Sequence, residues 1–193
     1  DTITMALSVF QRSLVSLDSP YDQYRRGNAS AIPDQAKRGE KLFNDKQCAS
    51  CHAGPHFTDS ALAGRKPYDS FHRLAMPADG KDMGLQRITQ KAEDAGKFRT
   101  PGLRNVALSA PYMHDGEVAT LGDAIRHHYG MPGQTDERLK QTISDGELSD
   151  LVAFLETLTD QGFISNPAFA LPKPGCPVAA DFSLTREEAI SAR

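Results

Sequence analysis

Apolar residues near the beginning of the chain recur at the spacing of an α-helix. They stand three or four positions apart and so share one helical face: Ile3, Ala6, Leu7, Phe10, Leu14 and Leu17. The pattern predicts a helix that ends at Asp18-Ser19-Pro20, because proline interrupts a helix. The polar segment RRGNASAIP then follows as a linker.

Three more segments have helical patterns, at residues 34–43, about 121–129 and 145–158. The first turns Leu42 and Phe43 inward. The last begins with a capping box formed by Ser144 and Glu147, ahead of apolar residues at helical spacing: Leu148, Leu151, Val152, Leu155 and Leu158. These patterns predict an all-α fold without internal repeats.

The segments between and after these helices are of two kinds. Residues 54–111 are rich in Gly, Pro and Asp and have no period of 2 or 3.6, which predicts a long ordered loop. A loop of this length in a compact domain needs something packed beneath it. Residues 161–193 contain the proline-rich run LPKPGCP and are predicted to form an extended arm.

Composition narrows the possible classes of function. The chain has 193 residues, which fits one domain with appendages, and an apolar fraction of 39%, which is low for a large core. The net charge of −3 and the absence of long basic runs argue against a nucleic-acid partner. No segment approaches the roughly twenty apolar residues that would span a membrane.

The segment CASCH carries the strongest chemical signal. Cys48, Cys51 and His52 have the spacing C-x-x-C-H, and the only further cysteine, Cys176, is too distant to complete a four-ligand zinc site. A thioredoxin-like redox pair would need a βαβ context, which the flanking residues lack. The spacing is typical of covalent haem attachment, with two thioethers and a histidine on the iron. We expect one haem c, which would fill the space beneath the long loop.

The residue on the other face of the iron decides what such a haem can do. The candidates are methionines, histidines and one tyrosine: Met76, Met83, Met113, Met131, His56, His72, His114, His127, His128 and Tyr129. In TLGDAIRHHYG, His128 shares the apolar face with Leu121, Ala124 and Ile125, whereas His127 points away. Helical geometry therefore favours His128, while Met113 and Met131 remain open because a thioether is also a common ligand.

Three other residues have candidate roles. Arg99 and Arg104, in FRTPGLRN, could pair with the haem propionates, because a guanidinium fork matches a carboxylate. The alternative is that both are ordinary surface arginines. Cys176 is left over after thioether formation, so it is either free or joined to another chain.

Several motifs in a fixed order resemble a known family. The runs RGEKLFNDKQCASCHAGPHFTD and GKFRTPGLRNVALSAPYMHDGEVATLGDAI resemble the C-terminal half of the bacterial dihaem cytochrome c peroxidases, which include the MauG enzymes. The segment FQRSLVSLDSPYDQYRRG is similar to the interdomain helix and linker of that family. The resemblance implies an interdomain segment at residues 1–30, a cytochrome c-like haem domain at 31–160 and the arm at 161–193.

The resemblance also implies roles for individual residues. Cys48 and Cys51 match the thioether anchors, and His52 matches the proximal ligand. The distal position of the family falls on His128, and a shift of one residue would place the MauG-like tyrosine at Tyr129.

The family also binds a calcium ion between its two haem domains. The backbone carbonyls that hold it match positions Ser109 and Pro111. Hard oxygen ligands of this kind suit calcium. The remaining ligands would come from residues outside this sequence.

The implied function is electron transfer in a dihaem peroxidase or MauG-like enzyme. Hydrogen peroxide would react at a second haem, and the sequence holds only one C-x-x-C-H, so we expect this chain alone not to be catalytic. A second haem-bearing domain or chain and a small electron-donor protein are the implied partners. The alternatives are a stand-alone monohaem electron carrier and a haem-based sensor or structural subunit.

The implied location is the bacterial periplasm. Attachment of haem c takes place outside the cytoplasmic membrane. We therefore expect an export signal that is not included in this sequence, which opens without a basic and apolar leader.

Overall fold

The computed structural model describes residues 2–62, 64, 66, 68–74, 82–130 and 136–170. The chain divides into two compact units, residues 1–163 and residues 164–193, and the first contains all the helices discussed below except the end of α7. Three residues named above, Met76, Met131 and Cys176, lie outside the described residues. The division into 1–30, 31–160 and 161–193 stays a prediction.

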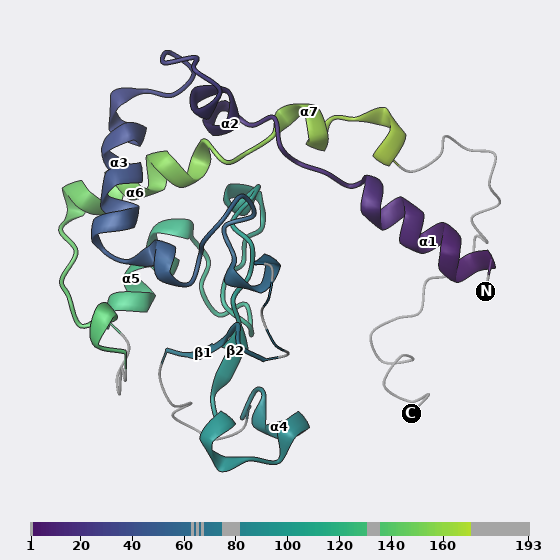
Figure 1. Cartoon of the computed structure of the whole chain (residues 1–193). Helices are drawn as coiled ribbons and strands as arrows, with labels where there is room; N and C mark the ends of the chain where they lie inside the picture. Colours follow the sequence, from purple (N-terminus) through teal and green to yellow (C-terminus); the bar gives the residue numbers. More distant parts are fainter. Residues whose placement is uncertain are drawn as a thin grey trace. The chain divides into compact units, whose positions relative to one another are not determined.

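The packing of helix α3 (Asp34–Asp45) against α6 (Asp145–Glu156) forms the centre of the first unit (Figure 1). Gly39 permits this close approach, because a Cβ atom there would lie 2.0 Å from the carbonyl oxygen of Asp150. Beside the contact, Arg38 donates two hydrogen bonds to the Asp150 carboxylate, at 2.9 and 2.8 Å. Buried apolar residues fill the core: Phe43, Phe57, Val106, Leu151, Phe154, Leu155 and Leu158.

The start of α6 is fixed by the predicted capping box. The Ser144 hydroxyl accepts from the Glu147 amide, and the Glu147 carboxylate accepts from the Ser144 amide at 2.9 Å. The helix ends at Glu156, two residues before the predicted end, and Leu158 is fully buried just beyond it. Helix α5 (Leu121–Gly130) packs against α6 and confirms the predicted helix at 121–129.

The N-terminal segment forms two helices where the pattern predicted one. Helix α1 (Thr2–Ser13) ends earlier than expected, and α2 (Pro20–Arg25) begins after Ser19, whose side chain caps it together with Asp22. None of the α1 residues is buried, and Leu14 and Leu17 are about two-fifths exposed. The last turn of the predicted helix, around Leu14 and Leu17, buries no apolar face and so lacks the packing that normally stabilises a helix.

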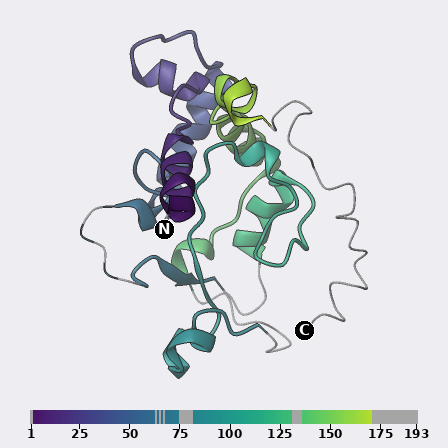
Figure 2. The same ribbon diagram turned by 90° about the vertical axis from the view of Figure 1, so that its right-hand side faces the viewer.

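The predicted loop at 54–111 contains short regular elements. Strands β1 (Phe71–Arg73) and β2 (Lys97–Arg99) pair antiparallel, with His72 opposite Phe98, and α4 (Gln86–Thr89) lies between them in sequence. These elements lie at the end of the unit opposite α2 (Figures 1 and 2). Strands of three residues are too short to produce a recognisable alternation, so the sequence pattern missed them. The helical class of the fold is confirmed.

The C-terminal arm is described as far as residue 170. It contains α7 (Gln161–Ile164) and a 3-10 turn at Pro167–Phe169. Within the described part of the chain, no helix is both long and apolar enough to cross a membrane.

Candidate haem site

The CASCH segment follows α3 directly and forms a tight turn. Gln47 adopts a left-handed conformation with φ 62° at the end of α3, and a 3-10 turn then runs over Cys48–Ser50. Cys48 and Cys51 are both half-buried and neither forms a disulfide. The two thiols are therefore presented from one turn, as attachment to the two vinyl groups of a haem requires.

The two thiols differ in acidity. Burial raises the pKa of the Cys48 thiol. Burial also pushes the pKa of Cys51 upward, but hydrogen bonding and charge from His72, with help from Ser50 and Arg138, outweigh it and leave that pKa below its usual range. Cys51 is therefore the more nucleophilic thiol before attachment.

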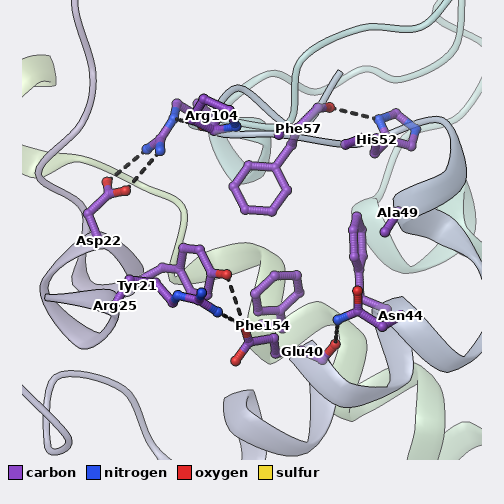
Figure 3. Close-up of a pocket in the computed structure, with 14 residues that line it drawn as sticks. Tyr21, Asp22, Arg25, Glu40, Asn44, Ala49, His52, Phe57, Arg104 and Phe154 are labelled. Carbon is purple, nitrogen blue, oxygen red and sulfur yellow. Dashed lines mark hydrogen bonds and ion pairs between the residues drawn. The ribbon is translucent and has the colours of Figure 1, made fainter. Parts of the chain in front are cut away.

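The ring of His52 is oriented by two backbone carbonyls. Its Nδ1 donates to the carbonyl oxygen of Phe57 at 3.1 Å (Figure 3) and to that of Pro101 at 3.2 Å. Because Nδ1 carries the proton, Nε2 holds the lone pair that a metal needs. Burial is the main cause that lowers the pKa of His52 to about 4, so the ring is neutral at physiological pH. This arrangement is that of a metal-ligating histidine with its second nitrogen anchored.

His128 has the same arrangement on helix α5. Its Nδ1 donates to the carbonyl oxygen of Ala124 at 2.7 Å, which leaves the lone pair on Nε2. Burial lowers the pKa of His128. The charge that His128 would carry when protonated also contributes to lowering the pKa of His52, so the two rings lie within electrostatic reach of each other.

Tyr129 lies beside the first cysteine rather than beside His52. Its hydroxyl is 3.5 Å from Cys48 Sγ and donates to the carbonyl oxygen of Lys46 at 3.4 Å. Burial is the main cause that raises the pKa of Tyr129, so the phenol is neutral. Met113 is half-buried in the loop before α5, at φ 67°. The structure thus gathers His128 and Tyr129 around the CASCH turn.

The two candidate arginines are placed very differently. Arg99 is exposed on β2. Arg104 is largely buried and donates to both oxygens of Asp22, each at 2.8 Å, and to the carbonyl oxygen of Pro55 at 2.7 Å. This ion pair ties the loop after CASCH to α2. The roles of both arginines at the propionates stay predictions.

The predicted calcium positions lie in an exposed turn. Ser109 and Pro111 flank Ala110, and the Ala110–Pro111 bond is cis. The Ser109 hydroxyl donates to the carbonyl oxygen of Val106 at 2.9 Å. In the described part of the chain, histidine, cysteine and carboxylate side chains form no cluster suited to a metal ion.

Sequence reasoning missed a buried pair beside the second cysteine. His72 Nε2 is 2.7 Å from Oδ2 of Asp59, which is fully buried. The Asp59 amide also donates to the carbonyl oxygen of Cys51 at 2.8 Å. The pKa of His72 is raised to about 9, first by the hydrogen bond with Cys51 and further by Asp59. Only the short motifs FTD and FHR could have suggested this contact.

A cavity of about 450 Å³ lies behind the CASCH turn (Figure 3). It has an aromatic floor and a charged rim, and its lining residues are Tyr21, Asp22, Arg25, Glu40, Phe43, Asn44, Ala49, His52, Ala53, Gly54, Pro55, Phe57, Arg104 and Phe154. This cavity was not predicted either, because its walls come from segments far apart in sequence.

The family model of cytochrome c matches residues 36–159. The chain belongs to the cytochrome c family. Membership implies a covalently bound haem c, and the residues present fit that group, because two free thiols adjoin a neutral histidine whose Nε2 carries the lone pair. The cytochrome c fold and the predicted attachment of haem c therefore agree.

The relatives of this cytochrome c domain are peroxidases and MauG proteins. The chain is 36% identical over 178 residues to the methylamine utilization protein MauG of Methylophilus methylotrophus, covering 89% of this chain and 50% of that protein. It is 36% identical over 165 residues to the cytochrome c peroxidase Ccp of Escherichia coli K12, covering 82% of this chain and 32% of that protein. The chain thus spans half or less of these curated relatives.

A solved structure gives the same result. The crystal structure of a MauG-like protein associated with microbial copper homeostasis matches with a TM-score of 0.74 and 38% identity, covering 86% of this chain and 59% of that one. The predicted resemblance to the dihaem peroxidases and MauG proteins is confirmed.

Proposed function

We propose that this chain is the C-terminal, electron-transfer haem domain of a dihaem peroxidase or MauG-like enzyme. The observation that carries the proposal is the pair of neutral imidazoles, His52 and His128. Each has its Nδ1 proton fixed on a backbone carbonyl and its Nε2 lone pair available in the ring, in the neighbourhood of the two thiols. Such a pair would hold the iron of one haem through His52 and His128.

Each residue then has a defined role. Cys48 and Cys51 form the thioethers, His52 is the proximal ligand and His128 is the distal ligand. A haem c held here would supply an iron that gains and loses one electron at a time. With two imidazoles in place, no position is left for peroxide, which suits electron transfer.

The reaction with hydrogen peroxide belongs to a second haem. That haem is carried by another part of the polypeptide or by a partner chain, where peroxide is reduced to water or a protein substrate is oxidised. A small electron-donor protein delivers electrons to this domain. Calcium at the carbonyls of Ser109 and Pro111 would join the two haem domains, and the assembly would work in the periplasm.

One observation favours a second candidate function. The sequence contains a single C-x-x-C-H, as expected of a stand-alone monohaem electron carrier. Such a protein would exchange electrons with donors and acceptors without reacting with peroxide.

Stopped-flow spectroscopy of the native haem-loaded protein distinguishes the two functions. The protein is reduced with a small c-type cytochrome and mixed with hydrogen peroxide. The dihaem proposal predicts that the donor is reoxidised at a rate proportional to peroxide and that His128→Gly slows this reaction. Donor oxidation no faster than in the absence of the protein would contradict the proposal and support the carrier.

A further inference from the structure

Tyr21 and Glu40 form a hydrogen-bonded pair in the cavity behind the CASCH turn. The Tyr21 hydroxyl donates to Oε1 of Glu40 at 2.9 Å, and Arg25 donates to the same oxygen at 3.1 Å (Figure 3). Tyr21 and Glu40 are half-buried on α2 and α3, so the pair joins the two helices. The phenol thus has a carboxylate directly on its proton.

Two other tyrosines have different hydrogen-bond partners. The Tyr112 hydroxyl donates to the carbonyl oxygen of Val106 at 3.0 Å, and Tyr129 contacts Cys48 Sγ and the carbonyl oxygen of Lys46. An amide carbonyl or a sulfur atom is a poor proton acceptor, whereas a carboxylate is a base. Of these three tyrosines, Tyr21 is the one whose hydroxyl donates to a carboxylate within the described part of the chain.

A short series of contacts connects Tyr21 to His52. The rings of Tyr21 and Phe57 meet edge to face, with centroids 5.6 Å apart. The carbonyl of Phe57 accepts the proton of His52 Nδ1 at 3.1 Å. Phe57 is buried and adopts φ 52°, an uncommon conformation for a non-glycine residue, and its ring and carbonyl make these two contacts.

We propose that Tyr21 is a redox-active residue that donates one electron toward the haem held by His52. Hydrogen peroxide, reduced to water at the second haem, would first remove one electron from this haem beyond the ferric state. The O–H bond of Tyr21 then breaks, the proton moves to Glu40 Oε1 and one electron passes to the oxidised haem, which leaves a neutral phenoxyl radical. A one-electron reductant that reaches the cavity restores the phenol, which regains its proton from Glu40. The inference rests on the proposed function in one respect, because hydrogen peroxide is the oxidant that creates the demand for this electron.

The acidity of Tyr21 agrees with this coupling of proton and electron. Burial, followed by the hydrogen bond with Glu40, raises the pKa of Tyr21 to about 12. The phenol therefore keeps its proton at neutral pH until it loses an electron. The base that accepts this proton, Glu40, must already be hydrogen-bonded to the phenol when the electron leaves.

Electron paramagnetic resonance after rapid freezing tests the inference. The native haem-loaded protein is mixed with hydrogen peroxide and frozen within milliseconds. We expect a tyrosyl signal that disappears in Tyr21→Phe and persists in the controls Tyr24→Phe and Tyr68→Phe, of which Tyr68 is an exposed residue. Glu40→Gln should reduce the yield of radical and abolish its dependence on deuterated solvent. Unchanged haem spectra and thermal unfolding would establish that each variant is folded.

Photochemical oxidation separates this inference from the proposed function. A flash-generated ruthenium(III) complex oxidises the same protein without peroxide. A Tyr21-dependent radical under the flash, with no haem change on adding peroxide, would contradict the proposed function and support the inference. A tyrosyl signal that survives in Tyr21→Phe, or none at all under the flash, would overturn the inference.

Discussion

His128 and His127 are adjacent, yet only His128 has the contacts of a metal ligand. The Nδ1 proton of His128 is held by the Ala124 carbonyl, and His128 lies within electrostatic reach of His52. We predict that His128→Gly converts the low-spin ferric haem to high spin, or opens it to added imidazole, because the iron loses one ligand. His127→Gly is the matched control and should leave the absorption and resonance spectra unchanged.

Three outcomes would contradict this assignment. Loss of the ligand in the His127 variant would show that the face of α5 is wrongly assigned. A ferric absorption band from sulfur to iron would instead identify a methionine such as Met113 as the ligand. A high-spin shift confined to Tyr129→Phe would favour the tyrosine.

Glu147 gives the stability of the domain a defined dependence on pH. Its carboxylate accepts a hydrogen bond from the Ser144 amide and forms an ion pair with Lys46 at 2.9 Å. These contacts lower the pKa of Glu147 from 4.5 to about 2, and the hydrogen bond from the Ser144 backbone is the largest cause. Because the folded pKa is the lower one, the stabilisation is complete above about pH 4.5 and is lost as pH falls toward about 2.

The matched comparison uses two positions on the same helix. The loss of unfolding free energy caused by Glu147→Gln, measured by urea denaturation, should shrink as the pH falls through this window. Glu156→Gln, at the exposed end of α6, is the matched control and should change the free energy of unfolding little. A constant difference for Glu147→Gln would contradict the assigned contacts.

At the scale of the elements, the crossing of α3 and α6 depends on Gly39. A methyl group there would lie 2.0 Å from the Asp150 carbonyl oxygen, and backbone cannot yield as a side chain does. We predict that Gly39→Ala lowers the free energy of unfolding by about 1–3 kcal/mol. Gly146→Ala, also in α6 but with nothing within 4 Å, should be neutral or stabilise by up to about 1 kcal/mol. Equal effects of the two changes in denaturation would contradict this account of the crossing.

Helices and their caps were predictable because their signals are local. Ser144 and Glu147 stand three residues apart as a capping box ahead of leucines at helical spacing, so the sequence alone located α6. The pairing of β1 with β2 was not predictable, because three-residue strands leave no period. The early end of α1 was missed because spacing reveals an apolar face but not whether anything covers it.

The candidate site divides in the same way. Cys48, Cys51 and His52 lie within five consecutive residues, so a sequence motif identifies them. The orientation of the His52 ring depends in part on the carbonyl of Pro101, which is 49 residues away. Arg104 pairs with Asp22, which is 82 residues away. The residues around Arg104 do not indicate whether its partner is a haem propionate or the Asp22 carboxylate. Long-range contacts of this kind require the fold.

At the scale of the whole molecule, the proposed function requires a second haem in addition to the one expected at CASCH. The chain covers half of its MauG relative and a third of its peroxidase relative. Eight large apolar side chains between Ile3 and Leu17 are exposed, which is a surface suited to further protein. These observations agree with a domain that works beside a second haem-bearing domain or chain.

The most direct test of this central claim is the haem stoichiometry of the purified native assembly, measured by intact mass spectrometry after denaturation in acid acetone. We predict one haem bound covalently through Cys48 and Cys51, and a second haem on the same polypeptide or on a copurifying chain. Release of the haem from the CASCH segment would contradict the attachment. A complete, monomeric protein with a single haem would contradict the dihaem function.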